Sequence, residues 1–272
     1  MSDAPKTASA TSYDSSSDER FTEYYAAASE SQTTRDRFVS IREKVLWLRG
    51  HLGLPVEKLD VADIGCGAGT QARLWASGGH RVCGVDINAP LVGIARERAE
   101  KEGLQIRFDV GSATALPYED ASFDVCILPE LLEHVPEWEP CLSEAARVLR
   151  KGGILQLSTT NRLCPKQDEF NLPLYSWYPQ SLKRHYEKLS VTTRPELANF
   201  ARYPAVHWFD YFQLRDWFAA RGIETFDRFD MMHMRGASGP VGVALNAIRA
   251  VPPVRWIAQV FTPYTLLFAI KR

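Results

Sequence analysis

The sequence predicts an α/β fold built on a doubly wound, mostly parallel sheet of seven strands with an inserted lid. From Leu59 to Thr159, short apolar segments alternate with longer segments whose apolar residues recur at helical spacing. Three alternate glycines, from Gly65 to Gly69, follow the first apolar segment directly. The chain has 272 residues, and its apolar content of 45% is normal for a packed core. Such alternation builds a parallel sheet covered on both faces, with ligands at the carboxyl ends of the strands.

The N-terminal part carries a polar tail and two helices. Residues 1–18 are rich in Ser, Thr, Ala and Asp and lack the basic and apolar regions of a signal peptide, so we expect a disordered tail. Residues 20–28 and 36–51 are predicted to be helices, which we interpret as a cap, residues 19–54, over the ligand cleft. Two aromatic side chains of the first helix could touch the ligand or pack in the interior: Tyr24 and Tyr25.

Residues 55–160 are predicted to form the core of the sheet, because short apolar strands and amphipathic helices follow one another there. We expect strands at residues 59–64, 81–86, 104–110, 123–128 and 153–159. We expect helices at residues 70–77, 90–102 and 138–149. Each helix then connects two strands and covers one face of the sheet.

The remaining chain interrupts and then completes this pattern. Residues 161–212 contain many prolines and aromatic residues, and we interpret them as an inserted lid. In residues 213–272 we expect the rest of a helix at 211–221 and two strands, at 223–230 and 264–271. These strands complete the seven-stranded sheet.

A mostly apolar segment at residues 240–261 lies between the last two predicted strands, with Arg249 and Arg255 interleaved. It could be a helix that packs on the core or forms a homodimer, or a patch with weak membrane-surface contact. The chain has no unbroken apolar stretch of the length needed to span a bilayer.

The glycine run is typical of a loop that holds a nucleotide cofactor. Glycines there allow a sharp turn, positive φ and close approach of the backbone to a ligand. Asp86 closes the next strand, about twenty residues after Gly65, where a carboxylate can accept hydrogen bonds from ribose hydroxyls.

The residues around the glycines indicate which cofactor this loop holds. The dinucleotide fingerprint requires glycine or alanine at its sixth position, and here that position is Thr70. The third glycine is Gly69, at position five, and Asp63 stands two residues before the first glycine. A carboxylate there suits a cofactor with an ammonium group and no phosphate, as in S-adenosylmethionine. With this acid-x-Gly-x-Gly-x-Gly motif the chain resembles the class I S-adenosylmethionine-dependent methyltransferases.

The resemblance covers residues 55–160. Three further segments are similar to later motifs of that superfamily: Gly111-Ser112-Ala113, Ser122-Phe123-Asp124-Val125 and Arg147-Val148-Leu149-Arg150-Lys151-Gly152-Gly153. It implies a Rossmann-like sheet with an antiparallel last strand. Many relatives carry an aspartate at Ser112, and a hydroxyl there gives adenine a weaker contact. The cofactor-binding residues that we predict are Asp63, Gly65, Cys66, Gly67, Gly69, Asp86, Ile87, Ser112, Ala113 and Pro129.

The residues after the fourth core strand are candidates for the chemistry. Glu130, Glu133 and His134 are spaced i, i+3 and i+4, so one helical turn would direct them to one side. In one interpretation His134 is a general base, because histidine exchanges protons near neutral pH, and a glutamate orients it. In another, the three residues bind a divalent metal that acidifies the acceptor hydroxyl. A structural role for Glu133 and His134 is the third.

The pattern Glu-x-x-Glu-His followed by Pro136 is similar to that of the ubiquinone-biosynthesis O-methyltransferases, and a divalent metal is part of what that resemblance implies. Two carboxylates favour magnesium, while an imidazole also permits zinc or manganese. Histidines of the lid, His185 and His207, are second candidates for a base or a metal ligand. His207 lies among aromatic residues that could stack on a ring or a sugar.

Charge and cysteine content limit the partners. The chain has 32 Lys plus Arg against 33 Asp plus Glu, so it lacks the basic field that gathers nucleic acid. Five cysteines without CxxC spacing indicate free thiols and a cytoplasmic protein. We therefore expect a methyltransferase that acts on a hydroxyl of a small-molecule or glycan-like acceptor. The alternatives are a C- or N-methyltransferase of the same fold and a non-catalytic cofactor-binding partner protein.

Overall fold

The structure is a computed structural model, and it describes residues 19–272 apart from 168, 199–204 and 206. The tail predicted at residues 1–18 lies outside the described residues, as do eight residues of the lid.

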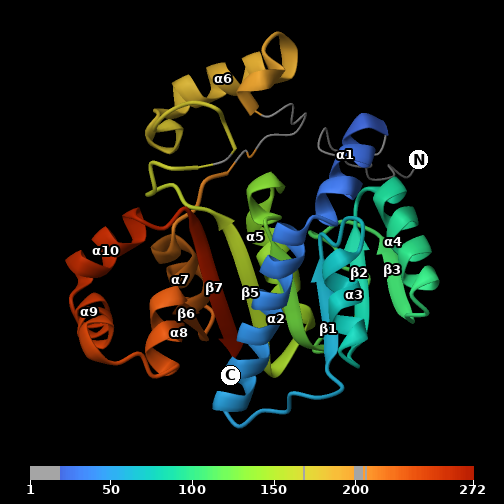
Figure 1. Ribbon diagram of the computed structural model, residues 1–272, viewed down its shortest axis with the longest axis horizontal. Helices are drawn as coiled ribbons and strands as arrows, with labels where there is room; N and C mark the ends of the chain where they lie inside the picture. The colour runs from blue at the N-terminus through green and yellow to red at the C-terminus, as the bar shows by residue number, and fades with distance from the viewer. Residues whose placement is uncertain (1–18, 168, 199–204, 206) are drawn as a thin grey trace, which may run out of the picture.

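The described residues form one seven-stranded sheet with the strand order β3-β2-β1-β4-β5-β7-β6 (Figure 1). Its strands are β1 (Asp60–Ile64), β2 (Arg81–Asp86), β3 (Ile106–Val110), β4 (Phe123–Pro129), β5 (Leu149–Thr160), β6 (Ile223–Asp227) and β7 (Tyr264–Lys271). The first five strands pair in parallel, and β7 pairs antiparallel with both β5 and β6. The predicted fold class, with its antiparallel last strand, is confirmed.

The central strand β1 explains where a ligand can bind. Val61 of β1 pairs with Val82 of β2 on one side and with Val125 of β4 on the other. The chain first builds outward from β1 through β2 to β3 and then crosses back to β4. The carboxyl ends of β1 and β4 therefore border the crevice where the strand order reverses, which is the usual ligand site of such sheets.

Helices cover both faces of the sheet (Figure 1). On one face, α2 (Gln32–His51), α3 (Thr70–Ser77) and α4 (Ala89–Lys101) bury side chains such as Val45, Trp75 and Ala95. On the other face, α5 (Trp138–Val148) and α7 (Tyr211–Ala219) bury Leu142 and Phe218. Because both faces are covered, all four residues of β1 after Asp60 are buried, rather than every second one.

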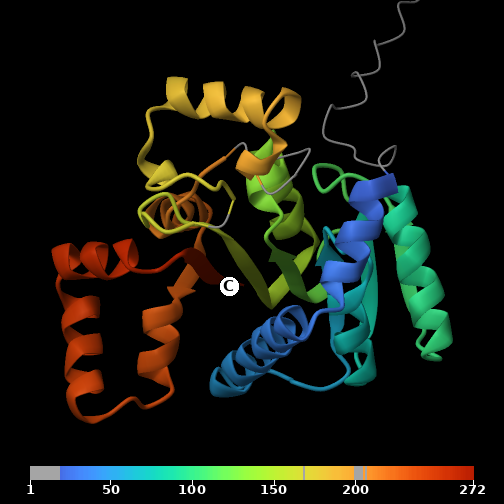
Figure 2. The ribbon, with the colours of Figure 1, turned by 45° about the horizontal axis from the view of Figure 1, so that its top comes forward.

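Two segments lie beyond the carboxyl ends of the parallel strands (Figures 1 and 2). One is the start of the cap, α1 (Glu19–Ser29). The other is the lid, which contains the 3-10 turns η2 (Tyr175–Trp177) and η3 (Pro195–Ala198) and the helix α6 (Gln180–Thr192). A further 3-10 turn, η1 (Leu132–His134), follows β4 at the same edge. The cap and the lid thus border the crevice from opposite sides.

The strand predicted at residues 223–230 is too long by three residues. β6 ends at Asp227, because the Asp227 side chain caps the helix α8 (Arg228–Met234) by accepting hydrogen bonds from the backbone N–H of Phe229 and Asp230, at 2.8 and 2.9 Å. Asp230 returns a bond to the Asp227 N–H, which completes a capping box. Residues 228–230 therefore belong to a helix and not to a strand.

The apolar segment predicted at residues 240–261 forms two helices, α9 (Gly239–Ala250) and α10 (Pro252–Val260). The two helices are separated at Val251, because the following residue, Pro252, disfavours helical geometry in the residue before it. Figure 2 shows α8, α9 and α10 as a group beside the sheet. No helix of the described residues is long and apolar enough to cross a membrane.

Candidate functional site

The loop after β1 is built for close approach. Gly69 has a φ of 78° and begins α3, and a Cβ there would lie 2.7 Å from Cβ of Ala95 in α4. At Gly67, with a φ of 49°, a Cβ would lie 2.7 Å from Cε1 of Tyr25 in the cap. Gly65 also has a positive φ, of 77°. The loop therefore needs glycine both for its backbone shape and for contact with the cap.

A cavity of about 140 Å³ opens over this loop, between the cap and the ends of β1 and β4. Asp63 and Gln71 line it, and their side chains are almost fully buried. Neither carboxylate oxygen of Asp63 and neither amide atom of Gln71 has a hydrogen-bond partner in the described structure. Buried polar groups are normally paired, so four orphaned polar atoms at one cavity point to a polar ligand.

The protonation of Asp63 depends on that ligand. Burial and the negative charge of Asp86 raise the pKa of Asp63 to about 7. The backbone N–H of Ala72, which lies near the carboxylate without the geometry of a full hydrogen bond, acts in the opposite direction. An ammonium group beside Asp63 would favour the charged carboxylate. The unpaired carboxylate of Asp63 and amide of Gln71 therefore fit the amino acid end of S-adenosylmethionine.

Asp86 stands at the end of β2, next to the glycine loop. Its carboxylate accepts hydrogen bonds from the backbone N–H of Gly67 and of Asn88, each at 2.8 Å. These bonds fix the orientation of the carboxylate beside the glycine loop. A contact of Asp86 with ribose hydroxyls stays a prediction.

Ile87, predicted to bind the cofactor, and the predicted adenine contacts Ser112 and Ala113 do not line the 140 Å³ cavity. Ile87 follows β2 and is 39% exposed. Ser112 and Ala113 follow β3, and the Ser112 hydroxyl lies 2.8 Å from that of Thr114. The structure thus brings Asp63, Gly65, Cys66 and Pro129 together at the cavity and leaves the adenine candidates at the neighbouring strand ends.

Cys66 is a buried filler of the loop. Burial, helped by the negative charges of Asp86 and Asp63, raises the pKa of its thiol well above the ordinary value. The thiol therefore stays protonated, which makes it a poor nucleophile.

Glu130 and Pro129 border the cavity at the end of β4. Glu130 has a φ of 54°, and its side chain forms an ion pair with Arg37 of the cap. Because of this backbone turn, Glu130 lies apart from the two other members of the predicted triplet. Arg37 is a contact that the sequence pattern did not indicate.

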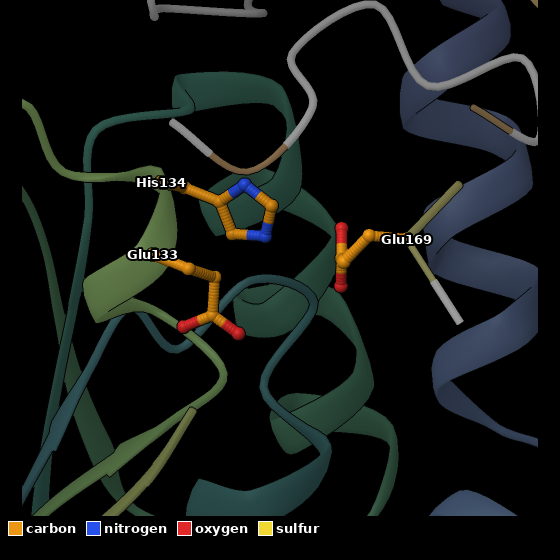
Figure 3. Close-up of side chains that lie close together, drawn as sticks. All are labelled: Glu133, His134 and Glu169. Atoms are coloured by element: carbon orange, nitrogen blue, oxygen red, sulfur yellow. The ribbon is translucent and has the colours of Figure 1, made fainter. Parts of the chain in front are cut away.

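Glu133 and His134 instead meet Glu169 of the lid (Figure 3). One potential ligand atom of each residue lies within 4.8 Å of those of the other two. In Figure 3 the three side chains point toward one another from the turn after β4 and from the lid. Two carboxylates and one imidazole suit a divalent metal such as manganese or zinc. Glu169 was missed because its partners lie more than thirty residues earlier in the sequence.

The environment of Glu133 shows how this group responds to charge. Burial raises the pKa of Glu133 to about 8, and the negative charges of Glu169 and Glu130 add to the increase. Its Oε2 accepts a hydrogen bond of 2.8 Å from the Thr159 hydroxyl, which opposes the increase. A cation among these carboxylates would favour the ionised form of Glu133.

The lid histidines have different surroundings. His207 donates its backbone N–H to the Glu133 carbonyl at 3.1 Å, and its Nε2 lies 2.9 Å from the Pro136 carbonyl oxygen. Because a carbonyl only accepts, Nε2 carries the proton and Nδ1 alone is left to act as a base. His185 is exposed on α6 and contacts Tyr186 edge-on.

A buried ion network fixes the cap to the cofactor loop. Glu30, between α1 and α2, binds Arg73 of α3 at 2.5 Å and Arg98 of α4 at 3.1 Å. The Thr70 hydroxyl, at the start of α3, donates to Glu30 at 2.8 Å. Although burial opposes it, these contacts lower the pKa of Glu30. Sequence periodicity does not indicate this network, because its members come from the turn before α2, from α3 and from α4.

Comparisons with known proteins indicate the family of the core. Residues 62–157 match a family model described as a methyltransferase domain. The chain is 38% identical over 117 residues to the ubiquinone biosynthesis O-methyltransferase of Azoarcus sp. (strain BH72), covering 43% of this chain and 49% of that protein. The chain thus spans about half the length of the curated relatives that it matches.

Solved structures share the fold. The YcgJ protein of Bacillus subtilis has a TM-score of 0.53 at 20% identity, over 85% of this chain and 99% of that chain. Phospholethanolamine N-methyltransferase 2 of Haemonchus contortus, in complex with phosphomonomethylethanolamine and S-adenosylhomocysteine, has a TM-score of 0.52 at 18% identity, over 92% of this chain and 60% of that chain. The family model and the sequence relatives confirm the predicted resemblance of the core to class I S-adenosylmethionine-dependent methyltransferases, and the solved structures confirm its fold.

Proposed function

We propose that this chain is an S-adenosylmethionine-dependent methyltransferase that methylates a hydroxyl of a small-molecule or glycan-like acceptor. The observation that carries the proposal is the pair of buried, unpartnered side chains at the end of β1, Asp63 and Gln71. The methyltransferase domain over residues 62–157 supports it independently.

Each candidate residue then has a role in holding the cofactor. Asp63 binds the ammonium group, and Gln71 offers a donor and an acceptor beside it. Asp86 accepts from the ribose hydroxyls. The glycines at 65, 67 and 69 let the backbone approach the cofactor, and Cys66 fills space behind it. Three residues contact adenine from the strand ends: Ile87, Ser112 and Ala113.

Methyl transfer is an in-line displacement, so orientation of the two reactants supplies much of the acceleration. The methyl group moves from sulfur to the acceptor oxygen, S-adenosylhomocysteine is released, and the hydroxyl proton must be taken up. Pro129 and Glu130 border the cavity near the methyl position, and the Glu130–Arg37 ion pair closes it toward the cap.

For the proton we favour metal assistance by Glu133, His134 and Glu169. A divalent metal held there would lower the pKa of a bound hydroxyl. Support comes from the 4.8 Å grouping of the three potential ligand atoms and from the high pKa of Glu133, which a cation would relieve. Glu130 would support this group through its charge rather than as a ligand. If no metal binds, His134 takes the hydroxyl proton directly, with His207 as the second candidate.

The segments divide this work. Residues 55–160 hold the cofactor, the cap at 19–54 closes over it, and the lid at 161–212 meets the acceptor, while residues 213–272 complete the sheet. The five cysteines are free, which supports the predicted cytoplasmic location. A C- or N-methyltransferase would gain less from a cation that acidifies hydroxyls. A non-catalytic binding protein would have no use for the Glu133–His134–Glu169 group.

Mass spectrometry tests the activity directly. The full chain is incubated with S-adenosylmethionine and panels of phenols, sugars, amines and carbon acids, and products are searched for an added methyl group. We expect methylated hydroxyl compounds, loss of turnover with excess chelator and its return with manganese, magnesium or zinc. Methylation of amines alone would contradict O-specificity, and full turnover in excess chelator would end metal assistance.

A further inference from the structure

The lid encloses a second and larger cavity, of about 790 Å³, that the cofactor does not need. We propose that this cavity binds the acceptor and selects one that carries an anionic group beside a ring. The inference rests on the proposed function and adds the substrate class to it. Three cationic side chains and three tryptophans line the cavity: Arg162, Lys183, Arg184, Trp177, Trp208 and Trp256.

Lys183 is the central observation. It belongs to α6, and its side chain is only 5% exposed. The ammonium donates a hydrogen bond of 2.9 Å to the carbonyl oxygen of Ser176 and lies 4.6 Å from the ring centroid of Trp208. Among the described residues it forms no ion pair with a carboxylate. Buried charges are normally paired, so an anion in the cavity would supply the missing counter-ion.

The other charges of the cavity leave it positive. Arg162 is neutralised by Asp210, at 2.5 Å. Arg184 is exposed on α6 and has no ion pair within the described structure. Glu187 is the one carboxylate among the lining residues, and burial raises its pKa while Lys183 and Arg184 lower it. Two cations therefore face one carboxylate, which leaves room for one further negative charge.

The tryptophans indicate a ring next to that charge. Trp177 of η2 is 54% exposed, and Trp256 of α10 is 50% exposed. These two large aromatic side chains come from distant parts of the chain and line one cavity. The Trp177 indole N–H donates to the Leu163 carbonyl at 2.9 Å, which fixes its ring. Aromatic faces at a cavity rim stack on sugar or phenol rings.

The cavity adjoins the proposed methylation site through His207. This residue lines the cavity, and its backbone N–H bonds to the Glu133 carbonyl at 3.1 Å. An acceptor whose anionic group meets Lys183 and Arg184 can thus direct a ring hydroxyl toward Glu133 and His134. Sugar acids, sugar phosphates and phenolic acids share this chemistry.

Binding of defined anions to the full chain tests the proposal, read by quenching of tryptophan fluorescence. The probes are glucuronate, glucose 6-phosphate and 4-hydroxybenzoate, each compared with a neutral counterpart: methyl glucoside for the sugars and phenol for the aromatic acid. We expect at least one anion to bind about tenfold or more tightly than its counterpart, since hydrogen bonds to charged groups contribute more than neutral ones. The anion that binds identifies the ring and the charged group.

Two variants and one control locate the binding. Lys183→Gln and Arg184→Gln should each lower the affinity for the anion about tenfold and leave the affinity for S-adenosylhomocysteine unchanged. Lys188→Gln, an exposed change on the same helix outside the cavity, should alter neither. Arg184→Gln keeps the test valid if Lys183→Gln unfolds the lid. Equal binding of anions and neutral compounds, or anion binding untouched by Arg184→Gln, overturns the proposal. If the unaltered chain does not bind S-adenosylhomocysteine, that result would instead contradict the proposed function.

Discussion

Asp63 is the residue on which the cofactor site depends most. Its carboxylate is buried at the end of a central strand, and neither oxygen has a hydrogen-bond partner among the described residues. A group left in this state costs stability in the ligand-free protein. Protonation removes the charge below about pH 7, and above that pH a cation in the cavity offsets the cost, which links the charge of Asp63 to cofactor binding.

We predict that cofactor affinity depends on pH through Asp63. Its pKa of about 7 means that the carboxylate is ionised above that pH in the ligand-free protein and protonated below it. An ammonium group binds the ionised form, so affinity for S-adenosylhomocysteine should fall by up to about tenfold for each pH unit below about 7. Titration calorimetry across this range measures it. Asp63→Asn should bind S-adenosylhomocysteine weakly, with an affinity that does not change with pH, and the exposed control Asp216→Asn should behave as the unaltered chain. If the affinity of Asp63→Asn still falls as pH is lowered, another residue is responsible for the pH dependence.

The raised pKa of Glu133 leads to a second prediction, which is tested by measuring stability rather than enzyme activity. Its pKa is raised from the ordinary value of 4.5 to about 8, so its contribution to folding is lost as pH rises through this window in the metal-free protein. Glu133→Gln should therefore raise the free energy of unfolding by roughly 1–3 kcal/mol above pH 8, measured by urea denaturation.

The same variant tests the metal. Manganese should raise the melting temperature of the unaltered chain and of the exposed control Glu139→Gln, but not that of Glu133→Gln. An equal increase in all three proteins would mean that the ion binds elsewhere.

Residues of the glycine loop could be predicted from the sequence because their function is local. Asp63, the glycines and Asp86 stand at fixed distances along two neighbouring strands, so spacing alone brings them together. Gln71, Arg37 and Glu169 could not be predicted in this way. Each acts through a partner from another element, and the backbone turn at Glu130, with its φ of 54°, separates that residue from Glu133 and His134.

At the scale of elements, Asp227 controls the junction between β6 and α8. Its buried carboxylate caps α8. The carboxylate also accepts a hydrogen bond of 2.7 Å from the Gln259 side-chain amide and forms an ion pair with Arg255 at 2.9 Å. The Asp227 side chain thus lies at the end of β6, caps the start of α8 and binds two residues of α10. The sequence predicted a strand through residue 230, since apolar spacing over so few residues does not distinguish a long strand from a strand followed by a short helix.

Removal of this carboxylate should loosen the group of α8, α9 and α10. We expect Asp227→Ala to lower the free energy of unfolding by about 2–4 kcal/mol, because it removes a helix cap and leaves Arg255 without one of its two carboxylates. Urea denaturation measures the change. Glu224→Ala, at an exposed ion pair on the same strand, should cost less than about 1 kcal/mol. Equal effects of the two variants would contradict the junction role.

At the scale of the whole molecule, α9, α10 and the residue after them carry many exposed apolar side chains. Apart from Trp256, which lines the lid cavity, the most exposed are Val241, Val243, Ile257 and Phe261, and we expect these four to share one apolar face. Arg249 and Arg255 both bind Asp230, so the two charges of this segment are directed to α8. We expect this face to meet a membrane surface through its apolar area.

Vesicle sedimentation tests this expectation. The chain should sediment with phosphatidylcholine and phosphatidylglycerol vesicles, with little dependence on salt. Replacing both Ile257 and Phe261 by serine should reduce binding, whereas Leu182→Ser, an exposed apolar position on α6, should not. A chain that ignores vesicles but forms dimers through this face would support the homodimer interpretation instead.

The sheet could be predicted because hydrophobic alternation and the motifs follow directly from local sequence. The relation of cap and lid to the sheet could not, since it depends on ion networks such as that of Glu30 with Arg73 and Arg98. The acceptor cavity likewise gathers residues from α6, from η2 and from α10. The substrate side of the molecule is therefore visible only after folding.

The central claim is that the carboxyl end of β1 holds an adenosyl sulfonium through Asp63 and Asp86. Titration calorimetry of S-adenosylhomocysteine, with a dinucleotide and a flavin as competitors, tests it most directly. We predict saturable binding of S-adenosylhomocysteine that Asp86→Ala weakens without a loss of fold, and no binding of the competitors. Uptake of a nicotinamide or flavin cofactor by a chain that gives no heat with S-adenosylhomocysteine would contradict the account.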